Sequence, residues 1–312
     1  MRNSRLLSLK PFVLLGRDIK AFLLRARQHP TPILVILPSF LLTIIFVYFF
    51  ILWTLTLSFT TSTLIPQYNW AGWKQYFILW SLPNWYKAIS NLGIFGVLYI
   101  GFSCGIGLLL AILLDQRIRF EGFIRPILLY PMSLSFIVTG TAWKWLLNPG
   151  LGIERVVRNW GWESFTFNWI IDPDRAIYAV ILVGVWQSTG FVMTLFLAGL
   201  RGIDSDIIKA ALLEGASIYK IYLRIILPQL RYTLLSAVII LAHLAIKSYD
   251  LVIALTGGGP GNATELPATF MYSYTFTRSK MAIGSASAIM MFMTVVAVIG
   301  PYLYNEFRTK KQ

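Results

Sequence analysis

The stretch RGIDSDIIKAALLEGASIYKIYLRIILP, from Arg201 to Pro228, is a polar, charged segment between two apolar stretches that are each long enough to cross a bilayer. Asp204 or Ser205 can cap a first short helix, and Gly215 supplies a stop that tolerates positive φ. Ser217 can cap a second helix, which Pro228 ends. We therefore predict two short helices at the membrane surface, placed where a soluble partner can grip them.

The composition places the chain in a lipid bilayer. Hydrophobic residues make up 57% of it and charged residues only 13%, and the mean hydropathy is +0.67. Soluble domains carry about a quarter of their residues charged, so we predict an all-α, polytopic membrane protein. The single cysteine, Cys104, has no partner for a disulfide or a cysteine-based metal site, and the sequence suggests neither a metal site nor a catalytic set.

Six apolar stretches are long enough to span the membrane, because a hydrocarbon core of about 30 Å needs roughly 20 helical residues. An even number of spans puts both termini on one side. Lysine and arginine concentrate in the N-terminal arm, the second-to-third and fourth-to-fifth connections and the tail, so the positive-inside rule predicts cytoplasmic N and C termini. The expected spans lie near residues 33–58, 89–114, 124–147, 176–199, 232–255 and 281–304.

The net charge of +14 follows from this topology and predicts contact with anionic membrane lipid, not nucleic acid. Residues 11–28 have the pattern of an amphipathic helix lying on the membrane surface. The outward connections are instead rich in tryptophan and tyrosine, which fits an interfacial belt, a surface for an extracytoplasmic partner, or both. In the second span, Gly101, Gly105 and Gly107 indicate close helix packing.

Three segments carry a resemblance to a known family. Residues 186–204 read WQSTGFVMTLFLAGLRGID, residues 209–228 read KAALLEGASIYKIYLRIILP, and residues 247–264 read KSYDLVIALTGGGPGNAT. In this order and topology they resemble the sugar-type (carbohydrate uptake) permease subunits of binding-protein-dependent ABC importers, which implies the type I ABC importer permease fold. The resemblance covers roughly residues 90–304.

The resemblance implies that residues 201–231 form the coupling loop of the EAA type, which seats in a groove on a cytoplasmic ATPase. The sequence departs from the family pattern at Lys209, where an acidic residue is usual, and at Glu214, where Asp is usual. Either the ATPase has a changed partner residue, or Asp206 makes the contact instead. The expected coupling residues are Asp206, Lys209, Ala210, Ala211, Glu214, Gly215, Ala216, Leu227 and Pro228.

The implied partners are a second permease, which completes a heterodimer, two cytoplasmic ATPase subunits and an extracytoplasmic solute-binding protein, all at the inner (plasma) membrane of a bacterium. The chain contains no GxxxxGK[ST] phosphate loop, so we expect a non-catalytic subunit without a cofactor, ATP being bound by the ATPase subunits. We expect a basic amphipathic cytoplasmic arm at 1–32, the first transmembrane helix and an outward loop at 33–88, a permease core at 89–304 and a cytoplasmic tail at 305–312.

Charged and polar residues inside the spans point to the solute pathway. His243, Lys247 and Asp250 fall at i, i+4 and i+7, which predicts one shared helical face, where Lys247 and Asp250 can neutralise each other or bind solute. Lys144 can instead reach the membrane interface. A sparse set of aromatic, amide and hydroxyl groups suits a sugar. The candidate pathway residues, including positions that the resemblance implies, are Trp186, Gln187, Ser188, Phe191, Leu241, Leu244, Lys247, Ser248 and Asp250.

The stretch GGGPGNATELPATFMYSYTF, residues 257–276, begins with a turn and resembles the branch that handles glucose, mannose or small glucosides, including compatible solutes such as glucosylglycerol. Two other classes stay open. An ion-coupled secondary sugar transporter would use His243, Lys247 and Asp250 as a relay. A membrane-embedded enzyme would need a nucleophile beside a base, and the sequence suggests none.

Overall fold

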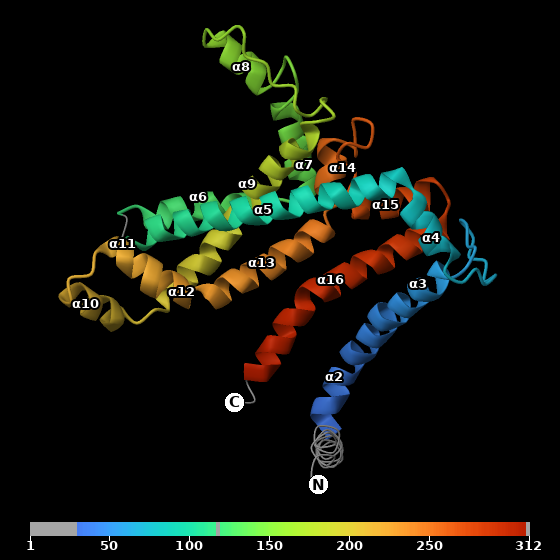
Figure 1. The fold of residues 1–312 in the computed structure, drawn as a ribbon, viewed down its shortest axis with the longest axis horizontal. Helices are drawn as coiled ribbons and strands as arrows, with labels where there is room; N and C mark the ends of the chain where they lie inside the picture. Colours follow the sequence, from blue (N-terminus) through green and yellow to red (C-terminus); the bar gives the residue numbers. More distant parts are fainter. Residues whose placement is uncertain (1–29, 117–118, 310–312) are drawn as a thin grey trace, which may run out of the picture. The chain divides into compact units, whose positions relative to one another are not determined.

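The computed structural model describes residues 30–116 and 119–309, and their side chains within 35–116 and 119–300. The chain divides into two compact units, Met1–Thr56 and Leu57–Gln312. All elements of the described ranges are helical, apart from one antiparallel bridge between Thr60 and Trp70, which confirms the predicted all-α class (Figure 1). The amphipathic helix predicted at 11–28 lies outside the described residues.

The described part of the first unit contains one apolar span. It is built from α2 (Pro30–Thr43), the π-helical turn η1 (Ile44–Phe49) and α3 (Phe50–Ser58), whose last two residues belong to the second unit. No residue is buried in the most apolar 18-residue window of the span Val35–Ser58. Large apolar side chains such as Phe46 and Phe49 are exposed all round it, as expected for a helix that meets lipid or another membrane helix.

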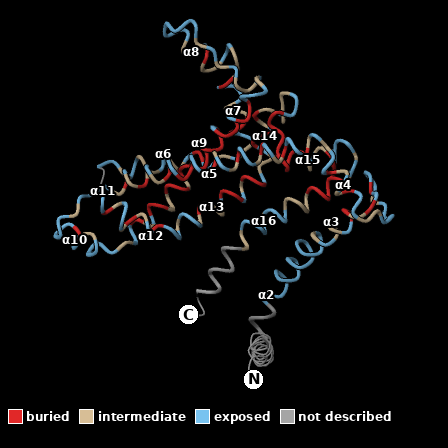
Figure 2. The backbone as a smooth tube through the Cα atoms, viewed as in Figure 1, coloured by how far each residue is buried: buried red, intermediate tan, exposed pale blue. Residues whose placement is uncertain are grey.

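The second unit carries all the remaining helices. Its elements are α4 (Lys74–Ser81), α5 (Pro83–Asp115), α6 (Glu121–Ser133), α7 (Phe136–Leu146), α8 (Ile153–Asn159), α9 (Ala176–Arg201), α10 (Ser205–Leu213), α11 (Ile218–Ile221), η2 (Tyr222–Ile226), α12 (Leu227–Gln229), α13 (Arg231–Ile246), α14 (Asp250–Leu255), α15 (Pro267–Tyr272), η3 (Ser273–Thr277) and α16 (Met281–Thr309). The largest contact between two helices joins α5 to α9. Buried residues gather along α9 and around α14 and α15, as Figure 2 shows.

Four helices of the described residues are long and apolar enough to cross a membrane, and two bent pairs bring the number of candidate spans to as many as six. The unbroken spans are those predicted first, second, fourth and last. The predicted third span consists of α6 and α7, which meet at an angle of 99°. The predicted fifth span begins with α13, which follows the helical segment Ile218–Gln229 after a bend of 60° at Leu230. Six spans fit the structure only if each bent pair counts as one.

The third span breaks at Leu134 and Ser135, which have extended backbone angles. Pro131, three residues earlier, cannot donate a helical hydrogen bond. Ser135 restarts the helix as its N-cap, because its Oγ accepts a hydrogen bond from the Val138 N–H at 3.3 Å. The prediction of a continuous helix over 124–147 is therefore wrong at this point.

The fifth span also differs from the prediction. Helix α13 ends at Ile246, and α14 begins at Asp250 after a turn, so His243, Lys247 and Asp250 do not share one helical face. The turn lets α14 lie close against α7, where a Cβ atom on Gly140 would stand only 2.6 Å from the Cβ of Ala254. A continuous helix over 232–255 would have no turn after Ile246. The close packing of α14 against α7 therefore depends on this turn.

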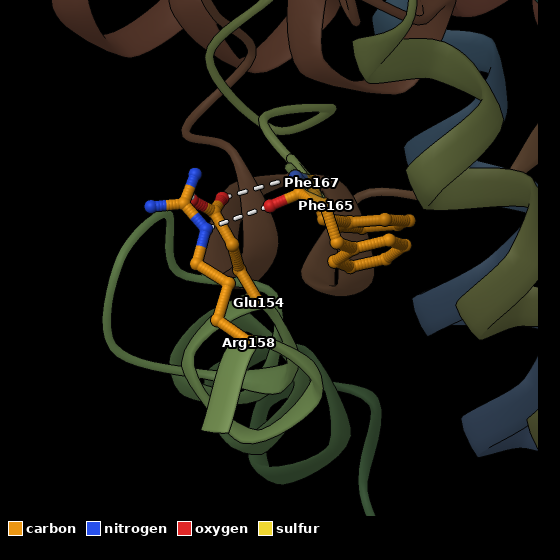
Figure 3. A network of polar contacts seen from close by, with 4 residues as sticks. All are labelled: Glu154, Arg158, Phe165 and Phe167. Carbon is orange, nitrogen blue, oxygen red and sulfur yellow. Dashed lines mark hydrogen bonds and ion pairs between the residues drawn. The ribbon is translucent and has the colours of Figure 1, made fainter. Parts of the chain in front are cut away.

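The outward connection between α7 and α9 is a folded lobe (Figure 3). Arg158 on α8 pairs with Glu154 at 2.7 Å, and its Nε donates to the carbonyl oxygen of Phe165 at 2.7 Å. Glu154 accepts a hydrogen bond from the backbone N–H of Phe167 at 3.0 Å. The Phe167 ring stacks on Trp169, with centroids 5.0 Å apart. These contacts hold α8 and the following loop together as one body.

Glycine at position 107 sets how closely α5 approaches α9. A Cβ atom there would lie 2.8 Å from Val192 Cγ1 and 3.0 Å from the backbone nitrogen of Met193, whereas Gly101 and Gly105 have nothing within 4 Å. Of the three glycines predicted to serve helix packing, only Gly107 is therefore at the contact between these two helices.

We expect Gly107→Ala to weaken the α5–α9 contact by about 1–3 kcal/mol, the usual cost of overpacking. The matched change Gly105→Ala places the same methyl group on the same helix in open space, so it should leave stability unchanged or raise it slightly. Thermal unfolding of the purified protein in detergent measures both. Equal midpoints for the two variants would contradict the assignment of Gly107 to the packing contact.

The carboxyl group of Glu265 is buried in the outward connection between α14 and α15, outside the candidate spans. Asn91 on α5 donates to the backbone carbonyl oxygens of Ala263 and Glu265 at 2.9 Å each, which fixes the loop. Among the described residues the side-chain Oε2 of Glu265 has no hydrogen-bond partner. Burial raises the pKa of Glu265 to about 7, and the charge of Arg278 opposes this shift.

The folded protein keeps the proton of Glu265 to higher pH than the unfolded chain does. The stability that the protonated Glu265 contributes is therefore complete below about pH 4.5 and is lost as pH rises through about 7. Glu265→Gln keeps the shape without the charge and should flatten this loss. The measurement is the unfolding midpoint from pH 4.5 to 7.5, with the exposed Glu163→Gln as control. An unchanged pH slope in Glu265→Gln would refute the buried-proton explanation.

Candidate functional site

The polar segment after α9 folds as two short helices joined at a glycine, as predicted. Asp204 caps α10, because its Oδ1 accepts a hydrogen bond from the backbone N–H of Asp206 at 2.9 Å. At the other end Gly215 has φ of +78°, and its N–H donates to the Leu212 carbonyl oxygen at 3.0 Å. We call Asp204–Pro228 the coupling element.

The second half of the coupling element differs from the prediction in detail. Ser217 stands at the N-cap of α11 but makes no side-chain cap hydrogen bond. The helix continues through the π-helical turn η2 and past Leu227 and Pro228 to Gln229. Proline is tolerated there because it occupies the first turn of the last helical segment. The change of direction comes at Leu230.

The exposed surface of the coupling element is apolar at its tip. Leu213 is 90% exposed, and Ile218 and Tyr219, on the other side of the glycine, are 67% and 73% exposed. Ala210 is exposed, whereas Ala211 is buried and belongs to the hydrophobic core. Of the two alanines predicted to receive a partner, only Ala210 therefore offers its surface. Such an exposed apolar tip on a charged segment is typical of a protein-binding surface.

The charges of the coupling element pair locally. Lys209 Nζ lies 2.8 Å from Asp206 Oδ1, one turn away on the same exposed face. At the base of the element Arg201 contacts Glu121 at 2.6 Å and Asp115 at 3.8 Å. Arg201 thus joins the inward ends of α9, α5 and α6. This clamp was not predicted, because spacing along the chain does not reveal which carboxylates lie beside an arginine from another helix.

Two small cavities lie where the broken third and fifth spans meet α5 and α9. The outer cavity has a volume of about 160 Å³ and is lined by Phe95, Tyr99, Phe136, Gly184, Leu244, Lys247, Ser248, Tyr249, Asp250 and Leu251. The inner cavity, of about 220 Å³, is lined by Met132, Leu134, Phe136, Gln187, Ser188, Phe191, Ile240 and Leu244. Phe136 and Leu244 line both, so they separate one cavity from the other.

Polar groups link the walls of the two cavities. The hydroxyl groups of Tyr99 and Ser188 lie 2.6 Å apart. Gln187 donates from Nε2 to the Leu134 carbonyl oxygen at 2.8 Å, which satisfies a backbone acceptor left by the break between α6 and α7. Its Oε1 is buried and has no partner among the described residues. This leaves one hydrogen-bond acceptor in the inner wall for a donor from outside the chain.

Seven of the nine predicted pathway residues line these cavities. They are Gln187, Ser188, Phe191, Leu244, Lys247, Ser248 and Asp250. Leu241 is fully buried in the core, and Trp186 faces the other side of α9, with its ring 5.4 Å from that of Trp143. Tyr99 and Phe136 also line the cavities and were not predicted, because a single aromatic residue in an apolar span carries no periodic signal.

Among the described residues no ion pair joins Lys247 to Asp250, so of the two alternatives for them, neutralising each other or binding solute, the first is not found. The end of α13 puts Lys247 at its C-cap and Asp250 in the first turn of α14, on separate helices. Both still line the outer cavity. His243 is exposed and lines neither cavity, so the predicted three-residue face is wrong.

Comparisons with known proteins agree with this architecture. A family described as "Binding-protein-dependent transport system inner membrane component" matches residues 103–310. A probable ABC transporter permease of Pyrococcus horikoshii is 37% identical over 290 residues, which cover 92% of this chain and 99% of the relative. The xylose/arabinose import permease of Haloferax volcanii is 41% identical over 217 residues, 68% of each chain.

A solved structure shows the same arrangement of helices. The crystal structure of a bacterial ABC transporter involved in the import of the acidic polysaccharide alginate superposes with a TM-score of 0.74, covering 95% of this chain and 98% of that chain at 19% identity. At this level of identity the likeness concerns the fold alone. It confirms the fold that the sequence predicted.

Proposed function

Because the chain belongs to the family of binding-protein-dependent transport system inner membrane components, we propose that it imports a sugar or small glycoside through the two cavities. It is the non-catalytic permease subunit of an ABC importer and crosses the inner membrane several times. The prediction of a bacterial membrane stays a prediction, because the two relatives above are archaeal. In this proposal the partner ATPases bind ATP and the chain itself needs no cofactor.

One observation carries the solute proposal: polar groups from separate helices converge on cavities that are otherwise apolar. Lys247, Ser248 and Asp250 come from the break in the fifth span, while Gln187 and Ser188 come from α9. A few placed polar groups within apolar walls suit a ligand with hydroxyl groups on a carbon ring. The Oε1 atom of Gln187, which lacks a partner among the described residues, is an acceptor for a sugar hydroxyl.

The volumes of the two cavities suggest how a solute passes between them. Each is smaller than the lower end of the usual range for ligand sites, about 300 Å³, so a solute needs both at once. Phe136 and Leu244 form the partition between them. We infer that solute passes when α7 and α13 move apart and carry these two side chains with them. The conformation described here would then be closed to solute.

The coupling element supplies the link to ATP. It connects α9 to α13, and each of these helices lines the pathway. We infer that a cytoplasmic ATPase grips its apolar tip and that closure of the ATPase pair moves both helices together, so that the pathway alternates between its two openings. Asp206 is held by Lys209, so the ATPase meets a neutralised pair instead of a lone carboxylate.

The further partners follow from the family. A second permease completes the pathway as a heterodimer, a solute-binding protein delivers sugar from outside, and two ATPase subunits act inside. Within the sugar class we propose glucose, mannose or a small glucoside such as glucosylglycerol, on the sequence of residues 257–276. The ion-coupled alternative loses support, because His243 lines neither cavity, whereas Lys247 and Asp250 line the outer one.

We expect ATP hydrolysis by the reconstituted complex to rise with one sugar of a panel, and only when the binding protein is present. In Lys247→Met and Asp250→Asn, the sugar concentration needed for transport should rise, because each change removes a polar group from the outer cavity. His243→Gln, outside both cavities, is the matched control. Unchanged transport in the first two variants would remove these residues from the pathway, and transport without ATPase subunits would overturn the ATP-driven mechanism.

At the tip of the coupling element, Leu213→Asp should weaken ATPase binding about thirtyfold, since a central apolar contact contributes about 2 kcal/mol or more. The aspartate would place a charge in the contact where the leucine side chain would otherwise be buried. Phe120→Asp makes the same kind of change at another exposed inward position and should have little effect. Co-purification of the ATPase and sugar-stimulated hydrolysis measure the result. Equal ATPase retention in both variants would refute the docking role of Leu213.

A further inference from the structure

A pair of buried hydroxyl groups joins the walls of the two cavities of the proposed solute pathway. Tyr99 on α5 lines the outer cavity, and Ser188 on α9 lines the inner cavity. Their hydroxyl oxygens lie 2.6 Å apart, and either of them can be the donor. Both residues are buried, with at most 5% of their surface exposed. We call Tyr99 and Ser188 the hydroxyl pair.

The hydroxyl pair has one hydrogen atom to spare. Each hydroxyl group carries one hydrogen, and the bond between the two oxygens uses only one of the two. Within the described ranges no further hydrogen bond is made by either hydroxyl. The spare hydrogen belongs to Tyr99, in the outer wall, when Ser188 donates, and to Ser188, in the inner wall, when Tyr99 donates. Because buried donors are normally satisfied, this hydrogen needs an acceptor from outside the described residues, such as a solute oxygen.

The Tyr99 ring is held in place by its own helix and by α9. It stacks on Phe95 with centroids 5.1 Å apart and ring planes 6° from parallel. A Cβ atom on Gly184 of α9 would lie 3.3 Å from Tyr99 Cδ2, so glycine leaves just enough room for the ring. A side chain that is already fixed loses little conformational freedom when it binds a ligand. The hydroxyl group of Tyr99 is therefore preorganised for contact with a solute.

We propose that the hydroxyl pair carries a hydroxyl group of the solute from the outer cavity to the inner one by reversing its own hydrogen bond, an inference that rests on the proposed function. In the outer cavity the solute oxygen accepts the hydrogen of Tyr99, while Ser188 donates to Tyr99. After Phe136 and Leu244 move apart, the solute oxygen accepts the hydrogen of Ser188, while Tyr99 donates to Ser188. Only the O–H bonds rotate, so every proton stays on its oxygen and no charge forms. The solute keeps one hydrogen bond to the pair in both cavities.

The inner wall selects a solute group that can both accept and donate. Gln187 precedes Ser188; its Nε2 donates to the Leu134 carbonyl oxygen, and its Oε1 has no partner among the described residues. A solute hydroxyl can accept the hydrogen of Ser188 and donate its own to Gln187 Oε1. A deoxy position can do neither and leaves both protein groups unpaired, which a buried polar site discriminates against strongly. Tyr99 and Ser188 are therefore specificity-determining residues for a polyhydroxylated solute.

The test uses the whole complex in proteoliposomes with its binding protein, and it measures the number of sugar molecules imported per ATP hydrolysed. Glucose, mannose and glucosylglycerol are the first probes, followed by monodeoxy derivatives of the sugar that is imported. Tyr99→Phe keeps the ring and removes the hydroxyl. We expect import per ATP to fall about threefold to tenfold, the effect of one neutral hydrogen bond. The derivative that lacks the recognised hydroxyl should be moved equally by the parent and by Tyr99→Phe.

Two further variants complete the design. Tyr76→Phe is the matched control, because Tyr76 also bonds a serine hydroxyl, that of Ser58 at 2.8 Å, and lines neither cavity. Ser188→Ala should cause the same loss as Tyr99→Phe, and the double variant no further loss, because the two hydroxyls act as one unit.

The outcomes separate the hydroxyl pair from the proposed function. Equal import per ATP in Tyr99→Phe and Tyr76→Phe would overturn the inference and leave the proposed function intact. An equal loss for the sugar and for every monodeoxy derivative would do the same, since it would mean a structural role only. A parent complex that imports none of the probes would refute the proposed function, and the inference with it.

Discussion

The close contact between α5 and α9 is the constraint on which the rest of the structure depends. Inside a bilayer, apolar burial hardly favours one helix pair over lipid, so close packing has to provide the affinity. Gly107 allows this contact, because any side chain there would meet Val192 and the backbone of Met193. With α5 and α9 joined, α9 lines the two small cavities of the candidate pathway, and α5 adds Phe95 and Tyr99 to the outer one.

The two broken spans build the candidate pathway around that pair. A helix break exposes backbone polar groups, which the membrane interior tolerates only where protein or a cavity satisfies them. Gln187 does so for the Leu134 carbonyl oxygen, and the turn after Ile246 brings Ser248 and its charged neighbours to the outer cavity. The same breaks that interrupt the apolar helices therefore place the polar groups that a hydrophilic solute needs.

The coupling element lies between α9 and α13, where it can transmit a movement to both helices. It is continuous with α9 on one side and, through the bend at Leu230, with α13 on the other. Arg201 holds its base to the inward ends of α5 and α6. A displacement of the tip therefore reaches the two helices whose side chains line the inner cavity. Stiff helices can transmit such a movement because their packed interiors deform little.

The sequence by itself determined the class, the approximate positions of the spans and the two-helix coupling element, because apolar length, capping residues and a left-handed glycine act locally. Five polar residues that line the two cavities were also predictable, because polar side chains stand out within apolar spans: Gln187, Ser188, Lys247, Ser248 and Asp250. Tertiary structure alone decided the breaks at Leu134 and after Ile246, the partners of Arg201 and the separation of Lys247 from Asp250. These features depend on how α7 meets α14 and α5 meets α9, and such long-range contacts leave no periodic pattern along the chain.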